Sequence, residues 1–255
     1  MKACRHILGV NKSACIHACL GELGRFPLLL CIIVNVIKYW VRLESLKSDS
    51  LLAVAFELEK KLHEKGLSTF FDFIKSVLAF CNCSHFLRTK NIKLSTVIRT
   101  VKKSLKAKFI DLWKKAIASN EKLSVYCKAK TAFRYEKYLS LVQNPFDRKA
   151  LTKTRISNHI FPIEVGRYKN IPRHLRLCTL CKCDVGDEFH CTMACQSAAV
   201  QNIRDTYCSS VFDIQTQLKH FDKMSLFKYI MSCSDDSIVH LTGKFCNEML
   251  KVYKM

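Results

Sequence analysis

Four residues in the last third of the chain have types and spacing suited to holding a metal ion. Cys178, Cys181, His190 and Cys195 follow the pattern C-x2-C-x8-H-x4-C. Two cysteines three positions apart can chelate one ion from a tight turn, and a His five positions before a Cys can do so from the start of a helix. Protein ligands would then fill all four places of a tetrahedral site. The spacing therefore predicts a structural Zn²⁺ site, since a catalytic one keeps a place for water.

Further cysteines leave the ligand assignment open. The chain has 15 cysteines, so chance clustering is the alternative interpretation, and Cys183 and Cys191 stand close enough to compete as ligands. Cys191 directly follows His190 and on a helix should project away from it, which favours Cys195. The polar residues 184–187 should reverse the chain between the two ligand pairs. Because the ligands assemble around the ion, metal binding should also stabilise the C-terminal half.

The chain carries a large positive charge that is concentrated in its middle. Lys and Arg number 42 against 21 Asp and Glu, a net +21, and 19 of the basic residues with only four acidic ones lie within 86–155. Such an excess indicates a polyanionic partner, RNA or DNA, bound mainly through its phosphates. For each single lysine, an ordinary solvated helix face is the alternative. The predicted contacts are Arg155, Arg167, Arg173 and Arg176 near the metal ligands, and Lys102, Lys103 and Lys106 upstream.

Helical signals predict the elements that position these residues. Only 7 Gly and 4 Pro interrupt the chain, and apolar residues recur at three- and four-residue spacing, so the fold should be mainly α. We expect a basic helical region over 1–143, a small zinc knuckle within 144–210, and closing helices over 211–255. The expected helices cover 26–41, 51–62, 69–80, 94–116, 148–159, 196–207, 224–231 and 237–253, with turns and short extended pieces over 160–176.

Several of these helices carry recognisable ends. Pro27 suits a first helical turn, Ser50 with the two residues before it can cap the next helix, and Gly66 can stop that helix in a left-handed conformation. Asp235 and Asp236 should cap the last helix. The helix over 94–116 should bury one stripe of apolar residues, formed by Val97, Val101, Leu105, Phe109, Leu112 and Ala116.

The most apolar segment, 26–41, is better explained as a buried helix than as a membrane span. Asn35 and Lys38 interrupt it, and it falls short of the roughly 20 apolar residues that a bilayer requires. We therefore expect no integral membrane segment, although a peripheral membrane role is a third alternative. The odd number of cysteines and the lack of a signal-peptide pattern indicate a reducing, intracellular location, cytoplasmic or nuclear.

Short phrases around the predicted zinc site resemble the C-terminal region of non-LTR, LINE-type retrotransposon polyproteins, downstream of the reverse-transcriptase domain. The phrases are Gly21-Glu-Leu-Gly-Arg-Phe-Pro-Leu28, Lys38-Tyr-Trp40, Arg155-Ile-Ser-Asn-His159, Ile163-Glu-Val-Gly-Arg167, Ile171-Pro-Arg173, Arg176-Leu-Cys178-Thr-Leu-Cys181 and Asp187-Glu-Phe-His190. The resemblance implies the same four zinc ligands and a knuckle that helps to hold template RNA or target DNA. Cys191 and Gln196 depart from it, since relatives usually have an aromatic residue and a proline there.

The same resemblance predicts that the chain is not an enzyme by itself. Polymerases hold two metal ions with paired aspartates in a palm domain, and this chain corresponds to a region downstream of that domain. Asp235 and Asp236 lie beyond the knuckle without a partner acid, and no nuclease motif is found. Possible partners are therefore RNA or DNA, the missing reverse-transcriptase domain, or another protein. The alternatives to nucleic-acid binding are a protein-interaction module and a translated remnant without function.

Overall fold

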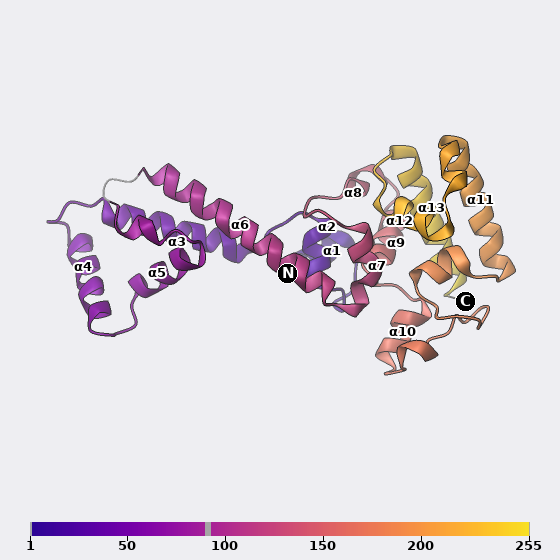
Figure 1. The fold of residues 1–255 in the computed structure, drawn as a ribbon, viewed down its shortest axis with the longest axis horizontal. Coiled ribbons are helices and arrows are strands. Elements are labelled where there is room, and N and C mark those ends of the chain that lie inside the picture. Colours follow the sequence, from indigo (N-terminus) through magenta and orange to yellow (C-terminus); the bar gives the residue numbers. More distant parts are fainter. Residues whose placement is uncertain (1, 90–92, 255) are drawn as a thin grey trace. The chain divides into compact units, whose positions relative to one another are not determined.

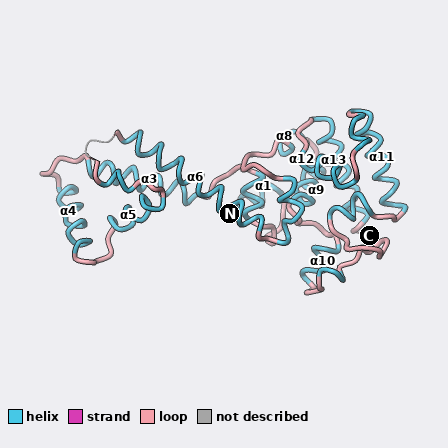
Figure 2. The backbone as a smooth tube through the Cα atoms, in the orientation of Figure 1, coloured by secondary structure: helices cyan, strands magenta, loops and turns pink. Residues whose placement is uncertain are grey.

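The computed structural model describes residues 2–89 and 93–254, and over these residues the protein is mainly α (Figures 1 and 2). Within the described ranges, the β pairing consists of two isolated bridges, Leu23 with Tyr135 and Leu177 with Val185. The helices are α1 (Lys2–Leu8), α2 (Ile16–Glu22), α3 (Leu28–Glu44), α4 (Leu51–Glu64), α5 (Phe70–Phe80), η1 (Ser84–Leu87), α6 (Leu94–Ala118), η2 (Glu121–Leu123), α7 (Ser124–Ala129), α8 (Tyr138–Leu141), α9 (Pro145–Arg155), α10 (Pro162–Tyr168), η3 (Arg173–Leu175), η4 (His190–Ala194), α11 (Ala198–Ile214), η5 (Thr216–His220), α12 (Lys223–Ser232) and α13 (Asp236–Val252).

The chain forms two compact units whose limits differ from the predicted regions. The insert unit comprises 26–112, and the knuckle unit comprises 1–25 together with 113–255. The predicted boundaries after residues 143 and 210 both fall inside the knuckle unit. They do not separate domains there because α8, which precedes the first boundary, and α9 and α11 all pack against α13, so residues from both sides of each boundary share one core.

The insert unit is a small helical bundle built from α3, α4, α5, η1 and the first part of α6. Its core joins apolar residues of these elements, including Ile37 and Trp40 of α3 and Val97 and Val101 of α6. Ser50 caps α4 by accepting a hydrogen bond from the Ala53 N–H at 3.2 Å. Gly66 follows α4 with a φ of +79°, so the predicted left-handed stop is confirmed. Thr69 begins α5 with a capping box completed by Asp72.

Helix α3 is buried on one face only. Ile37, Trp40 and Leu43 lie in the core, whereas Leu28 and Leu29 are largely exposed. The expected burial of this segment is therefore correct for one face and wrong for the other. In the part of the chain that the structure describes, no helix is long and apolar enough to cross a membrane.

The buried stripe of α6 turns around the helix instead of staying on the predicted line. Val97, Val101 and Leu105 are buried as expected, but Leu112 is exposed, and Trp113 and Ile117 are buried in its place. All five buried positions are related by steps of four residues. Since each residue turns the helix by about 100°, every such step advances the buried line by about 40°, and the stripe moves to a new face along the helix.

The knuckle unit is organised around the long helices α9, α11 and α13. Asn144 caps α9 by accepting a hydrogen bond from Phe146 N–H at 2.9 Å. Helices α11 and α13 pack against each other, and the rings of Tyr207 and Phe245 stack between them at a centroid distance of 4.2 Å. Asp235 accepts a hydrogen bond from Ile238 N–H at 3.1 Å, which confirms the predicted cap of the last helix.

Two predictions for 148–176 are wrong. The helix expected over 148–159 is α9, which begins at Pro145 and ends at Arg155, because Ser157 adopts a positive φ of +52°. The segment expected to be turns with extended pieces contains α10 instead. Pro162 occupies the first turn of α10, where its missing N–H costs no helical hydrogen bond. Pro162 therefore begins a helix inside a segment that was expected to contain none.

Candidate metal centre

A tight turn presents the first two cysteines of the predicted site. Cys178 donates its N–H to the carbonyl of Asp184 at 2.8 Å, and its own carbonyl accepts from Lys182 N–H at 2.9 Å. Lys182 has a φ of +56°, which reverses the chain directly after Cys181. Gly186 then packs against the ring of Pro162, where a Cβ atom would approach the proline Cγ to 2.7 Å. Helix α10 thereby supports the turn.

A single π-helical turn presents the other two residues. His190 begins η4 and Cys195 follows it, and Cys195 donates its N–H to the His190 carbonyl at 2.8 Å. The N–H of His190 is held by Asp187 Oδ1 at 2.8 Å. The expected start of an α-helix at the histidine is thus a π-helical turn, which brings the side chains of residues five apart to one side.

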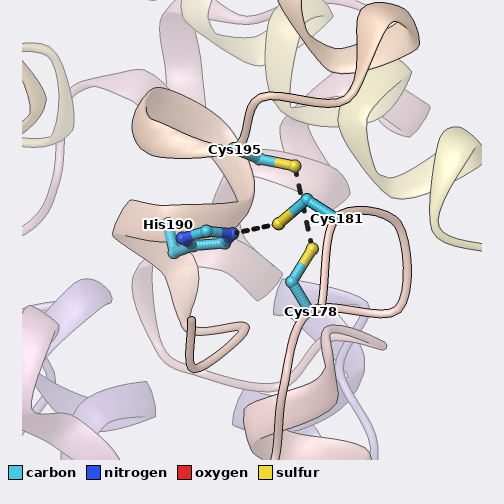
Figure 3. A group of neighbouring side chains, drawn as sticks. All are labelled: Cys178, Cys181, His190 and Cys195. Atoms are coloured by element: carbon cyan, nitrogen blue, oxygen red, sulfur yellow. Dashed lines mark hydrogen bonds between the residues drawn. The ribbon is translucent and has the colours of Figure 1, made fainter. Parts of the chain in front are cut away.

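The four predicted side chains converge, as Figure 3 shows. One ligand atom from each of Cys178, Cys181, His190 and Cys195 lies within 4.8 Å of the others. Cys178 Sγ is 3.7 Å from Cys195 Sγ, and Cys181 Sγ is 3.1 Å from His190 Nε2. Cys181 is half-buried and the other three are buried. Three sulfur donors and one nitrogen donor in this arrangement could hold a metal ion.

The two competing cysteines differ in their surroundings. Cys183 is exposed, and its Sγ donates to the carbonyl of Cys181 at 3.0 Å. Cys191 is completely buried, and its interaction with Cys178 lowers the pKa of the Cys178 thiol. Cys191 does not belong to the group of side chains whose ligand atoms converge, so the preference for Cys195 over Cys191 agrees with the structure. Burial raises the pKa of the Cys191 thiol.

Tyr253 also reaches the cluster and was not anticipated. Its Oη lies 3.2 Å from Cys178 Sγ, across 75 positions of sequence. Burial raises the pKa of its hydroxyl, so Tyr253 remains a hydrogen-bond donor. Its ring packs edge-on against Phe161 at 5.0 Å. Neither spacing nor composition signals this contact, which depends on where α13 ends.

A buried polar group fixes the segment just before His190. Glu188 accepts hydrogen bonds from the Ser157 hydroxyl and from His159, whose Nε2 lies 2.9 Å from Glu188 Oε1. Burial opposes ionisation of this carboxyl, but the charge and hydrogen bond of His159 and the bond from Ser157 outweigh it, and the pKa of Glu188 is lowered. The segments 155–159 and 187–190, both part of the resemblance described above, are thus in contact.

Arg155 is not available to a phosphate, so its prediction as a nucleic-acid contact is wrong. Its side chain is 2% exposed and forms a bidentate ion pair with Glu22, at 3.0 and 3.1 Å. It also bonds to Glu136 at 3.1 Å, and Tyr138 donates its hydroxyl to Glu22 at 2.6 Å. A buried guanidinium requires such partners, and sequence spacing could not reveal them.

The other three arginines predicted to contact nucleic acid differ in how exposed they are. Arg176 is half-buried and donates to the carbonyls of Ile171 and Ile163 at 2.7 and 3.0 Å, so it mainly braces the loop after α10. Arg167 lies 3.7 Å from Glu164 and is partly exposed. Arg173 is the most open of the four arginines, with 49% of its side chain exposed.

The predicted lysines belong to the insert unit. Lys102, Lys103 and Lys106 are exposed on α6, and this helix carries seven Lys and Arg against one Asp. Lys106 Nζ lies 4.9 Å from the ring centre of Phe26. These three lysines are therefore solvent-accessible within the insert unit.

Comparisons with protein-family models, with curated proteins and with solved structures gave no match for this chain.

Proposed function

We propose that the candidate metal centre holds one structural Zn²⁺. Three thiolates and one imidazole are a donor set that zinc prefers. Two sulfurs on a tetrahedral zinc are about 3.8 Å apart, close to the 3.7 Å between Cys178 and Cys195. A sulfur and a nitrogen ligand are about 3.6 Å apart, so Cys181 and His190, at 3.1 Å, would separate slightly on binding. The bound ion would fasten the turn to η4 and leave no place for a substrate.

The chain as a whole is proposed to bind RNA or DNA and to act by binding alone. The observation that carries this proposal is the exposure of Lys102, Lys103 and Lys106 on α6, a helix that holds seven Lys and Arg against one Asp along its length. Lys102, Lys103 and Lys106 would contact phosphates, and Arg173, with the less exposed Arg167 and Arg176, would do so near the knuckle. The resemblance to LINE-type polyproteins agrees with such a role, and it places the protein inside the cell, in cytoplasm or nucleus.

One set of samples tests both parts of this proposal. The natural chain, purified under reducing conditions, should contain one zinc per chain, and His190→Ala should lose it, whereas the exposed His240→Ala should not.

Fluorescence anisotropy with single-stranded RNA and DNA should show affinity that falls as salt rises. Lys102→Glu/Lys103→Glu should weaken binding without loss of zinc. A folded natural chain free of zinc would contradict the metal assignment, and zinc-loaded protein without salt-dependent binding would contradict the nucleic-acid assignment.

Exposed apolar side chains favour a second candidate function, contact with another protein. Leu28 on α3 is 73% exposed and Leu51 on α4 is 84% exposed, and large exposed apolar surfaces usually mark interaction sites. The upstream reverse-transcriptase domain implied by the resemblance is one such partner. A purified chain that is monomeric and does not bind hydrophobic dyes would contradict this function. Other exposed apolar residues of these two helices are Leu29, Ile32, Tyr39, Leu52, Val54 and Leu58.

A further inference from the structure

A small hollow lies beside the candidate metal centre, within the knuckle unit. Its volume is about 160 Å³. Helices α7 and α12, Arg173 and the segment just before His190 form its walls. Its lining includes Lys128, Arg173, Asp187, Phe189, Phe227 and Lys228.

The lining combines cations with an apolar floor. Lys128 and Lys228 are exposed, and Arg173, half-exposed, lies 3.9 Å from Asp187, the one acidic lining residue. Phe189 meets Phe227 edge to face at a centroid distance of 5.7 Å. The lining therefore has three positive groups against one negative group, arranged over aromatic and methionine side chains.

This combination of cations and an aromatic surface fits a nucleic-acid base with its flanking phosphates. Single strands are bound by aromatic side chains that stack on bases and by cations that follow the phosphates. The hollow is smaller than the roughly 300 Å³ of ordinary ligand pockets, so it has room for one flat ring system and not for a whole nucleotide. The sugar and phosphates would remain outside, where the cationic side chains lie. A base paired in a duplex could not enter it.

We propose that this hollow receives one unpaired base of a single-stranded RNA or DNA, with the flanking phosphates on Lys128, Arg173 and Lys228. The proposal rests on the proposed nucleic-acid function and names the part of the strand that reaches the knuckle. The base would lie against Phe189 above the buried floor of Phe227. Because a paired base could not enter the hollow, this mode of binding would favour single strands over duplexes.

The first test compares two charge reversals of equal size. Lys128→Glu/Lys228→Glu changes the hollow, and Lys219→Glu/Lys244→Glu changes two exposed lysines of the same unit that do not line it. Anisotropy titrations of a fluorescent 12-nucleotide RNA over a range of salt give the affinity and its salt slope. Two lost phosphate contacts should lower the slope by about 1.4, at about 0.7 for each contact to a single strand. The control pair should change it far less, and zinc content should stay at the natural value in both.

The second test locates the base. A strand with a single photoreactive 4-thiouridine should crosslink, on irradiation, to peptides that contain Phe189 or Met224, and an excess of duplex should not compete. Normal affinity of Lys128→Glu/Lys228→Glu with crosslinks confined to α6 would overturn the inference and leave the proposed function intact, and would indicate a hollow that takes a protein side chain instead. Absence of binding by the zinc-loaded natural chain to any oligonucleotide would overturn the proposed function itself.

Discussion

At the scale of single residues, Tyr253 connects the end of the last helix to the candidate metal centre. Its hydroxyl lies 3.2 Å from Cys178 Sγ, and hydrogen bonds to ligand atoms orient them and tune their affinity for metal. We predict that Tyr253→Phe binds zinc about 10- to 100-fold more weakly, because the ring stays against Phe161 while the donor is lost. Competition with a chromophoric zinc chelator measures this affinity. Tyr229→Phe, which removes a hydroxyl bonded to Gln215, is the matched control, and equal affinities of the two variants would disprove the role of Tyr253.

The residues of the candidate site differ in how far sequence could predict them. The four candidate ligands lie within one short segment, and their types and spacing, with the argument against Cys191, were enough to predict that they converge. Cys195 was correctly preferred to Cys191, but the full burial of Cys191 could not be read from the local sequence. Arg155 was misassigned because its partner Glu22 is 133 positions away. Burial and long-range pairing are products of the tertiary fold, and a basic residue shows no sign of them in the local sequence.

At the scale of elements, the pair of Glu22 and Arg155 fixes α2 to the end of α9. Both side chains are buried, and removal of one partner from a buried ion pair costs roughly 3–5 kcal/mol. Glu22→Gln should therefore lower the free energy of unfolding of the knuckle unit by about 3 kcal/mol, since Glu136 still supports the guanidinium. Urea unfolding followed by Trp113 fluorescence, in a Trp40→Phe background, reports on this unit. Asp205→Asn, at a carboxylate 75% exposed near Arg204, should change stability by less than about 1 kcal/mol, and equal effects of both variants would argue against the pairing.

Sequence predicted the helix ends correctly where a capping residue was present. It failed where tertiary packing determined which residues are helical or buried. Ser50, Gly66 and Asp235 act as their types predict, because a cap involves only a few neighbouring residues. Helix α10 was missed since a proline and a glycine near its ends look the same in a turn and in a short helix. The drift of the α6 stripe was missed because Val97, Val101 and Leu105 are buried in the insert unit, whereas Trp113 and Ile117 are buried in the knuckle unit.

At the scale of the whole molecule, the two units should respond differently to loss of metal. Each has its own buried core, and all four candidate ligands belong to the knuckle unit. Metal binding to a structural site contributes directly to folding, because the unfolded chain offers no assembled ligands. Chelation should therefore release the turn at Cys178 and η4 from each other and loosen the parts of the knuckle unit that pack on them, while the insert unit has no ligand to lose.

Hydrogen exchange with mass spectrometry, with and without a strong zinc chelator, measures this difference along the chain. We predict faster exchange over 160–200 and in the last turns of α13, where Tyr253 contacts Cys178, and unchanged exchange in α3 and α5. His190→Ala should reproduce the pattern without chelator, and the exposed His240→Ala should respond to chelator as the natural chain does. Equal loss of protection in both units would mean that the core of the insert unit is not sufficient to keep that unit folded. Unchanged protection everywhere would mean that the knuckle is held by its hydrogen bonds and apolar contacts, with the metal contributing little to the fold.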